Sequence, residues 1–361
     1  HRIIAHRARR GGDTGLRQAQ KSPPAYRRPE PHSAFMTAPI ETPLLQIDSL
    51  SVHFPIERGL LRRKVGEVRA VDGVSLDIRP GETVGLVGES GCGKSTLGRT
   101  VVKLQSATGG DVLLDGEPIS EKVQTARDVQ LIFQDPFSSL NPRMKVGEAI
   151  GEVLRQHQIV PADKVAERTE ELLQMVDLSP EHAYRYPHEF SGGQRQRIGI
   201  ARALAVEPRL IICDEVVSAL DVSVQAQILN LLMRLQREKE LAYLFISHDL
   251  AVVRQIAHRI AVMYAGRIVE LGETDQVIGE PLHPYTQALM ASARGEGFTS
   301  GEVANPAHLP PGCHFHPRCS LAKDVAGGIR SDCLADYPEF REIDDGRWVA
   351  CHFAGERKTH E

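Results

Sequence analysis

Apolar residues along this chain fall into two kinds of segment. Short runs that are apolar at most or at alternate positions predict strands, and longer segments with apolar residues three or four positions apart predict helices. The expected strands cover residues 45–52, 68–78, 83–87, 112–114, 129–133, 210–213 and 244–246, and the expected helices cover 97–104, 146–157, 163–176, 192–205 and 224–237. Because strands alternate with helices, the pattern predicts an α/β fold around a parallel sheet, with the functional site along one edge of the sheet.

Composition changes twice along the chain. Residues 1–43 are basic and proline-bearing, without a periodic apolar pattern, and we expect a disordered extension in which Met36 is the candidate true start. An Arg-rich targeting presequence is the alternative, although no sustained amphipathic helix supports it. Residues 44–293 carry the α/β pattern, with a mainly helical subdomain at about 135–205. Residues 294–361 begin as a Gly-rich linker and continue as a tail rich in Pro, Cys and His.

The net charge and its distribution along the chain limit the kinds of partner that we expect. The chain has a net charge of −4; residues 1–35 hold eight Arg and Lys against two acidic residues, so they carry +6 and the remainder carries −10. An acidic body without a basic stripe argues against nucleic acid as a partner. No stretch approaches the roughly 18 consecutive apolar residues that a membrane span needs. We therefore expect a chain that does not cross a bilayer, although it could dock on a protein that does.

A glycine-rich segment between an expected strand and an expected helix carries the strongest chemical signal. It follows the G-x-x-x-x-G-K-[ST] pattern and consists of Gly88, Glu89, Ser90, Gly91, Cys92, Gly93, Lys94, Ser95 and Thr96. A strand that turns through glycines into a helix presents backbone N–H groups and the positive end of the helix dipole to an anion. Lys94 can reach the β- and γ-phosphates of a nucleotide, and the Ser95 hydroxyl can ligate Mg²⁺. This segment predicts a nucleotide site, and we call residues 88–96 the phosphate loop.

Two carboxylates follow another buried strand. Asp214 and Glu215 come directly after the apolar run 210–213. A carboxylate at the end of a strand beside a phosphate loop suits a Mg²⁺ ligand, directly or through water. Its neighbour can polarise an attacking water molecule. The pair therefore predicts nucleotide hydrolysis, with Asp214 supporting the metal and Glu215 acting on the water.

A second anion-binding helix start identifies the family. Ser191, Gly192, Gly193 and Gln194 follow Phe190 and open an expected helix, whose free N–H groups can face a phosphate. The motif resembles the Leu-Ser-Gly-Gly-Gln hallmark of the ABC-transporter ATPases. That resemblance implies a P-loop cassette with a RecA-like parallel sheet, an antiparallel β subdomain and a helical subdomain. It also implies that these four residues act on ATP bound by a partner subunit in a head-to-tail dimer.

Further residues match the motifs of this family in their usual order. The resemblance implies that Gln134 senses Mg²⁺ and the attacking water, and that His248 contacts the γ-phosphate and helps to position Glu215. It implies that Asp221 belongs to the loop that crosses the dimer interface. Phe54, near the end of the first strand, corresponds to the aromatic residue that stacks on adenine, and ordinary core packing is the alternative for this side chain.

Longer segments resemble the ATPases of the dipeptide/oligopeptide (peptide/nickel) permeases, over residues 44–355. They are 133–142, 214–227 and His283-Pro284-Tyr285-Thr286, and the pattern is most similar to the second, F-type ATPase of such systems. The resemblance implies a peripheral ATP hydrolase on the cytoplasmic face of the inner membrane. Its implied partners are two transmembrane permease subunits, a second and similar ATPase in a heterodimer, and an extracytoplasmic peptide-binding protein. Import of nickel or another small solute and, less favoured, a soluble ABC ATPase without a transport role are the alternatives.

Four cysteines crowd the tail: Cys313, Cys319, Cys333 and Cys351. In the reducing cytosol that a nucleotide site implies, clustered thiols suggest a metal rather than disulfides. The tail resembles the C-terminal extension of the peptide/nickel group, in which some members hold a 4Fe–4S cluster. The spacing by itself matches neither a zinc-finger nor a ferredoxin pattern. Zinc bound with His314, His316 or His352, and a tail packed around free thiols, are the alternatives.

Overall fold

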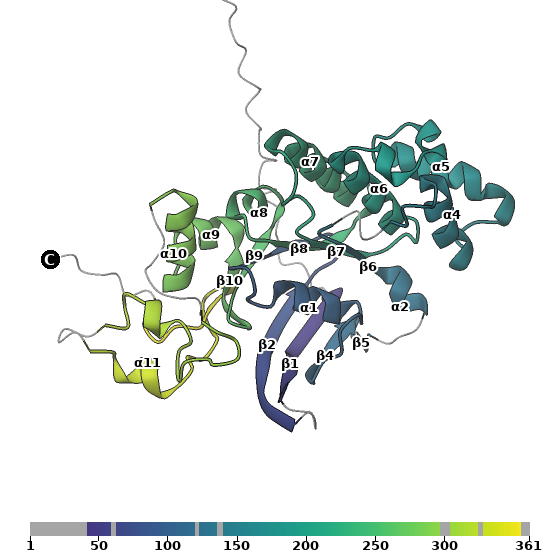
Figure 1. Cartoon of the computed structure of the whole chain (residues 1–361). Coiled ribbons are helices and arrows are strands. Elements are labelled where there is room, and N and C mark those ends of the chain that lie inside the picture. Colours follow the sequence, from purple (N-terminus) through teal and green to yellow (C-terminus); the bar gives the residue numbers. More distant parts are fainter. Residues whose placement is uncertain are drawn as a thin grey trace, which may run out of the picture. The chain divides into compact units, whose positions relative to one another are not determined.

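The computed structural model describes residues 42–58, 63–119, 123–135, 140–296, 304–323 and 328–354. Figure 1 shows their arrangement. The predicted N-terminal extension, including Met36, lies outside the described residues apart from Thr42 and Pro43.

The main sheet supports the phosphate loop. In the described chain it holds eight strands in the order β11-β12-β10-β9-β3-β8-β7-β6, and the five from β9 to β6 are mutually parallel. Every residue of β3, β7 and β8 is buried, which agrees with their nearly continuous apolar sequences. The strands are β3 (Thr83–Val87), β6 (Val129–Ile132), β7 (Leu210–Asp214), β8 (Ala242–Ser247), β9 (Arg259–Tyr264), β10 (Arg267–Glu273), β11 (Arg341–Asp344) and β12 (Arg347–Val349).

A second, antiparallel sheet has the order β2-β1-β4-β5. Its strands are β1 (Leu45–Arg58), β2 (Arg63–Ile78), β4 (Gly109–Leu114) and β5 (Glu117–Pro118). Both long strands extend beyond the predicted bounds of 45–52 and 68–78, because β1 and β2 continue as a paired ribbon with Ile56 opposite Gly66 and Glu57 opposite Lys64. The backbone of an exposed ribbon pairs without an apolar face, so the hydrophobic pattern does not reveal these residues as strand.

Helices cover the main sheet and form a group beside β6. The predicted helices appear within a few residues of their expected bounds, and in Figure 1 α4, α5 and α6 lie together at the β6 end of the sheet. The helices are α1 (Lys94–Val101), α2 (Val123–Asp128), α4 (Val146–Gln156), α5 (Val165–Met175), α6 (Gly192–Leu204), α7 (Val222–Lys239), α8 (Leu250–Ile256), α9 (Thr274–Gly279), α10 (Pro284–Ala293) and α11 (Ser331–Ala335), with 3₁₀ turns at Ala162–Lys164, Pro180–Tyr184, Pro187–Glu189 and His316–Arg318.

The C-terminal segment, residues 304–354, adds to the main sheet. Strand β12 pairs with β10, and residues 42–361 form one compact unit. The contact is fixed by a buried ion pair in which Arg347 donates to Glu270 at 3.1 Å. Glu270 also accepts hydrogen bonds from the backbone N–H groups of Leu282 and His283, both at 2.9 Å. A buried carboxylate is stable only when its oxygens are paired in this way.

His283 caps α10 from a fully buried position. Its Nδ1 accepts a hydrogen bond from the backbone N–H of Tyr285 at 3.0 Å. Burial lowers the pKa of His283 to about 3, against a smaller opposing effect of the hydrogen bond with the Ala350 backbone. The side chain is therefore neutral in the folded protein, as its role as an acceptor requires.

We expect this histidine to make the protein sensitive to acid. An unfolded histidine titrates near pH 6.5, so between pH 6.5 and 3 the unfolded state binds one more proton than the folded state. The free energy of unfolding therefore falls as the pH drops through this window, by about 2 kcal/mol at pH 5. His283→Asn keeps a capping oxygen but does not titrate, so it should lose less stability between pH 7 and pH 5 in denaturant unfolding. Equal losses in the two proteins would contradict the assignment.

Candidate ATP-binding and catalytic site

The phosphate loop is held tightly between neighbouring strands. It leaves β3, passes Gly88 and Gly93 at positive φ angles of 155° and 110°, and enters α1. A Cβ atom at Gly93 would overlap the carbonyl oxygen of Ala70 in β2, and one at Gly88 would overlap that of Met263 in β9. Glycine is therefore required at both positions by the close approach of other backbone as well as by φ. No side chain in the described chain caps α1, so the first-turn N–H groups are available to bind an anion.

Lys94 folds back over this loop. Its ammonium donates hydrogen bonds to the carbonyl oxygens of Gly88 at 2.8 Å and Glu89 at 2.9 Å, and the residue is buried. A cavity of about 210 Å³ opens beside it, lined by Ala70, Ser90, Gly91, Gly93, Lys94, Ser95, Thr96, Gln134 and Glu215. Backbone donors and an ammonium around one cavity provide the chemistry that a triphosphate needs.

The hydroxyl of Ser95 and the carboxylate of Asp214 lie together at the N-terminal end of α1. Ser95 Oγ donates to Asp214 Oδ1 at 2.8 Å, and Asp214 ends strand β7 in a buried position. Burial raises the pKa of Asp214, and the hydrogen bond from Ser95 opposes this effect. Two adjacent oxygen donors beside the phosphate cavity fit Mg²⁺, which prefers hard oxygen ligands together with substrate phosphates.

Glu215 is held between two polar side chains from neighbouring strands. Gln134 Nε2 donates to Glu215 Oε2 at 2.7 Å, and His248 Nδ1 lies 3.2 Å from Glu215 Oε1. Gln134 follows β6 and His248 follows β8, which flank β7 in the parallel sheet, so the three side chains reach the same edge. Glu215 has a φ of 50°, a strained value for a residue with a side chain that is typical of functional positions. The structure thus brings the predicted Gln134, Glu215 and His248 together.

The Ser-Gly-Gly-Gln motif lies apart from this cavity. Ser191 caps α6, accepting from the Gln194 N–H, while Gln194 Oε1 accepts from the Ser191 N–H at 3.0 Å. Ser191 and Gly192 are exposed, and a side chain at Gly193 would meet Val224 of α7. None of the four lines the chain's own phosphate cavity. The helix start is therefore formed and faces outward.

Two further predicted residues also lie outside the cavity lining. Asp221 is exposed at the start of α7, and Phe54 lies on β1 opposite Val68 with 36% of its surface exposed. Sequence reasoning missed Tyr285 and Arg318, which contact Glu89 of the phosphate loop. No signal near either residue points to the loop, because each lies roughly two hundred positions further along the chain.

The predicted iron–sulfur cluster and the zinc alternative are not supported. In the part of the chain that the structure describes, no group of three or more His, Cys, Asp or Glu side chains is arranged to hold a metal ion. Burial raises the pKa of Cys313 to about 12 and of Cys351 to about 11, so these two thiols favour the protonated form. The nearby histidines are engaged with protein: His316 Nδ1 with the Cys313 carbonyl, His352 Nε2 with the Asp336 carbonyl, and the His314 ring against Tyr337. The arrangement of donors in the described residues therefore supports neither an iron–sulfur cluster nor zinc.

Comparisons with known proteins agree with this geometry. Residues 71–218 match the ABC transporter family, and residues 269–325 match the oligopeptide/dipeptide transporter C-terminal region. The solved "Dimeric Structure of MJ0796, a Bacterial ABC Transporter Cassette" covers 64% of this chain and 98% of its own with a TM-score of 0.56 and 26% identity. The sheet, the phosphate loop and these matches define an ABC-type ATPase cassette.

Individual relatives place the chain in a narrower class of ABC-type ATPases. The chain is 49% identical to the oligopeptide transport ATP-binding protein AppF of Bacillus subtilis over 88% of this chain and 99% of that protein. It is 53% identical to the glutathione import ATP-binding protein GsiA of Escherichia coli over 82% of this chain and 48% of that protein. This chain belongs to the ATP-binding subunits of the oligopeptide/dipeptide ABC transporters, whose activity is ATP hydrolysis. No helix of the described residues has both the length and the apolar character to cross a membrane.

Proposed function

We propose that this chain powers the import of dipeptides or oligopeptides by hydrolysing ATP at the described site. The phosphate loop and Lys94 bind the triphosphate, and Ser95 and Asp214 hold Mg²⁺, which neutralises phosphate charge. Glu215 orients and polarises the attacking water, and Gln134 and His248 fix its carboxylate. The observation that carries the proposal is the Gln134–Glu215–His248 contact beside the phosphate cavity.

The site is completed by a second ATPase subunit. Ser191 to Gln194 form a helix start that does not line the chain's own phosphate cavity. The free N–H groups of such a helix end favour an anion, and the nucleotide of a second subunit would supply it. We propose a head-to-tail dimer with a similar but different ATPase, in which Asp221 lies at the interface and Phe54 stacks on adenine. Each chain then contributes the helix start of α6 to the ATP of its partner.

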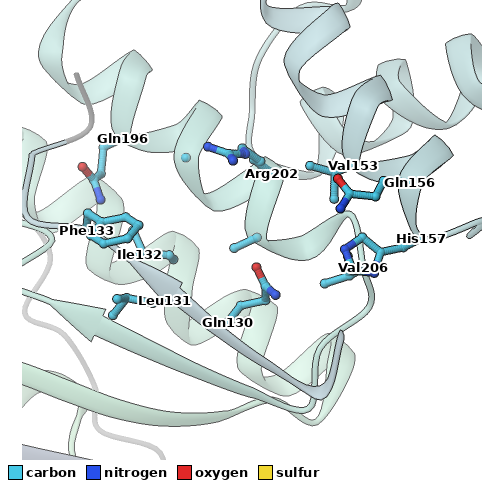
Figure 2. Close-up of a pocket in the computed structure, with 12 residues that line it drawn as sticks. Gln130, Leu131, Ile132, Phe133, Val153, Gln156, His157, Gln196, Arg202 and Val206 are labelled. Atoms are coloured by element: carbon cyan, nitrogen blue, oxygen red, sulfur yellow. The ribbon is translucent and has the colours of Figure 1, made fainter. Parts of the chain in front are cut away.

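A pocket lined in part by the residues that precede Gln134 is a candidate docking site for a membrane subunit. It has a volume of about 220 Å³ and lies between β6, α4 and α6. Figure 2 shows Phe133, which directly follows β6, with Gln156 of α4 and Arg202 of α6 around the same hollow. Because Phe133 directly precedes Gln134, a segment seated here is coupled through one residue to the carboxylate of Glu215. We propose that two permease subunits dock on such pockets, which places the chain on the cytoplasmic face of the membrane.

The transported solute is proposed from family membership. AppF is named for oligopeptides, and GsiA is named for glutathione, itself a small peptide. An extracytoplasmic peptide-binding protein is the expected supplier of the solute. Nickel or another small solute is the second candidate, favoured only by the resemblance to the peptide/nickel group.

Purification from native membranes in mild detergent tests this function. We expect two polytopic permeases and a second, similar ATPase to copurify with the full-length chain, and ATP-driven uptake of labelled dipeptide by vesicles that contain the complex. Lys94→Ala in the same complex should abolish uptake without changing its composition. Recovery with ribosomes or nucleic acid alone would refute the transport role, and uptake of nickel but not dipeptide would refute the peptide substrate.

A further inference from the structure

The C-terminal segment reaches into the phosphate loop through a buried ion pair. The guanidinium of Arg318 donates to both carboxylate oxygens of Glu89, from Nη1 to Oε2 at 3.0 Å and from Nη2 to Oε1 at 2.8 Å. The Arg318 side chain is 3% exposed and that of Glu89 is 17% exposed. We propose that Arg318 is a positioning residue for the phosphate loop, and that it sets the affinity for ATP by neutralising and orienting Glu89. This inference rests on the proposed placement of the ATP phosphates at the phosphate loop.

Every polar group of Glu89 has a partner. Its backbone N–H donates to the hydroxyl of Tyr285 at 2.8 Å, its carbonyl oxygen accepts from Lys94 at 2.9 Å, and its carboxylate pairs with Arg318. Glu89 therefore links the phosphate-binding ammonium to α10 and to the C-terminal segment. A bidentate pair between a guanidinium and a carboxylate fixes orientation as well as charge, so the conformation of the loop depends on Arg318.

The arginine is itself held in place by aromatic rings. Tyr264, Tyr285 and Phe315 pack with ring centroids 4.6 to 5.4 Å apart, and the guanidinium carbon of Arg318 lies 5.6 Å from the Phe315 ring centre. The three rings are almost fully buried. Such a cluster leaves Arg318 little freedom to swing away from Glu89. The loop is therefore preorganised before the nucleotide arrives.

The charge of Glu89 explains why this partner affects affinity. Without Arg318, a carboxylate would stand in the loop that has to receive the negative phosphates of ATP. Like charges in a partly buried site repel strongly because water screens them poorly. Neutralisation by Arg318 removes this repulsion, and the backbone N–H groups and Lys94 then act on the phosphates unopposed.

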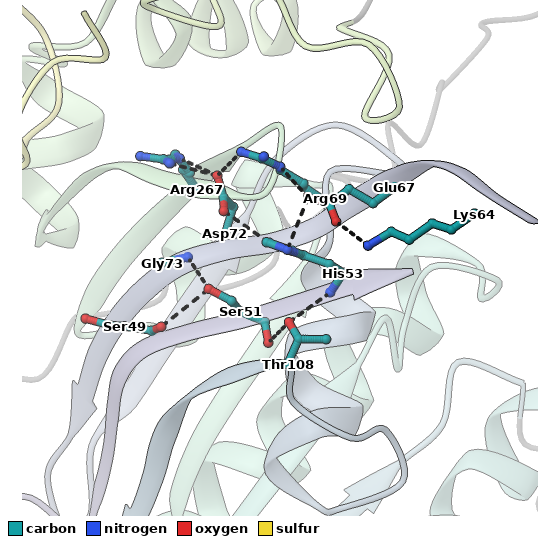
Figure 3. A network of polar contacts seen from close by, with 10 residues as sticks. All are labelled: Ser49, Ser51, His53, Lys64, Glu67, Arg69, Asp72, Gly73, Thr108 and Arg267. Carbon is teal, nitrogen blue, oxygen red and sulfur yellow. Dashed lines mark hydrogen bonds and ion pairs between the residues drawn. The ribbon is translucent and has the colours of Figure 1, made fainter. Parts of the chain in front are cut away.

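The C-terminal segment also supports the other wall of the cavity. Asp72 of β2 accepts from Arg267 at 2.7 Å and lies 3.1 Å from His53, as Figure 3 shows. The Arg267 guanidinium in turn stacks 4.2 Å above the ring of Tyr337 in the C-terminal segment. Ala70, two residues before Asp72, lines the phosphate cavity. The same segment is therefore linked to β2 through Arg267 and to the phosphate loop through Arg318.

Equilibrium binding of ATP to the purified full-length chain, measured without Mg²⁺ so that hydrolysis does not interfere, tests the proposal. Arg318→Met should weaken binding about tenfold, and the deficit should shrink as salt is added because screening reduces repulsion. Glu89→Gln combined with Arg318→Met should recover affinity to within about threefold, since no unpaired carboxylate is left. Arg318→Lys keeps the charge but not the bidentate geometry, so its affinity should lie between that of the unchanged protein and that of Arg318→Met. Arg341→Met, an exposed arginine of the same segment, is the matched control and should bind as the unchanged protein does.

The outcomes separate this role from simple structural support. Wild-type affinity in Arg318→Met overturns the proposal, as does a double variant that binds as weakly as the single one at every salt concentration. If Arg318→Met does not fold, as thermal melting without nucleotide would show, the double variant and Arg318→Lys decide by the same criteria. Lys94→Ala should abolish ATP binding. If this variant binds ATP normally, the proposed ATP site is wrong. If Lys94→Ala does not bind ATP but Arg318→Met binds it normally, the ATP site stands and only the positioning role of Arg318 is wrong.

Discussion

Replacing Glu215 with glutamine should reduce ATP hydrolysis by about 10²- to 10⁴-fold while ATP binding is retained. The amide keeps the shape of the side chain and its contacts with Gln134 and His248, which are 2.7 and 3.2 Å away. It cannot polarise the attacking water as a carboxylate does. Loss of the charge leaves the phosphate loop, Lys94 and the Ser95–Asp214 pair in place. The variant should therefore accumulate as an ATP-bound form, detected by binding of labelled ATP and by release of phosphate in a single turnover.

Glu240→Gln provides a matched control for this change. Glu240 has a φ of 53°, close to the 50° of Glu215, but it is exposed at the end of α7, away from the cavity. The control should hydrolyse ATP at the normal rate. Normal turnover in Glu215→Gln would refute the role of Glu215, and loss of binding in that variant would show that the carboxylate serves mainly to hold the site together.

Replacing Gly93 with alanine should abolish ATP binding. The added Cβ atom would overlap the carbonyl oxygen of Ala70, which belongs to the backbone of β2 and cannot rotate away. A φ of 110° is also strained for any residue with a side chain. The loop has to shift away from β2, and the N–H groups at the start of α1 move with it. We expect a loss of affinity of about a hundredfold or more, because a small displacement of positioning groups is costly.

Gly81→Ala separates this contact from backbone strain alone. Gly81 has a φ of 67° in the turn before β3, but nothing lies within 4 Å of its Cβ position. This control should lose about 1–2 kcal/mol of stability from the left-handed conformation and keep nearly normal affinity. The two variants are compared by ATP titration and by thermal melting. Equal affinities would show that the contact with Ala70 is not what keeps the phosphate loop in place.

Local signals predicted the chemistry of the site. The glycines and Lys94 of the phosphate loop, and the carboxylates Asp214 and Glu215, each follow a buried apolar run that the hydrophobic pattern reveals. Because carboxyl ends of neighbouring parallel strands share an edge, strand assignment was enough to expect that such residues meet. The contact of Gln134 and His248 with Glu215 follows from the same rule.

Other elements carry weaker local patterns. The ribbon beyond His53 has few apolar residues, and its pairing depends on the partner strand rather than on its own sequence. The cysteines of the tail suggest a metal site by composition, but ligand geometry depends on how distant segments pack, and the described residues do not provide it. The composition of the tail distinguishes it from the rest of the chain, but it does not indicate which residues the tail's side chains contact.

The sequence by itself determined the α/β class and the motifs that predict the nucleotide site, because these depend on short motifs and on the periodicity of neighbouring residues. Only the tertiary structure decided that β11 and β12 extend the main sheet, that Glu270 pairs with Arg347, and that Arg318 reaches Glu89. Those contacts join residues 77 to 229 positions apart. Side chains so distant in sequence meet only through the packing of the whole core, and no local pattern records which of the many charged residues will become partners.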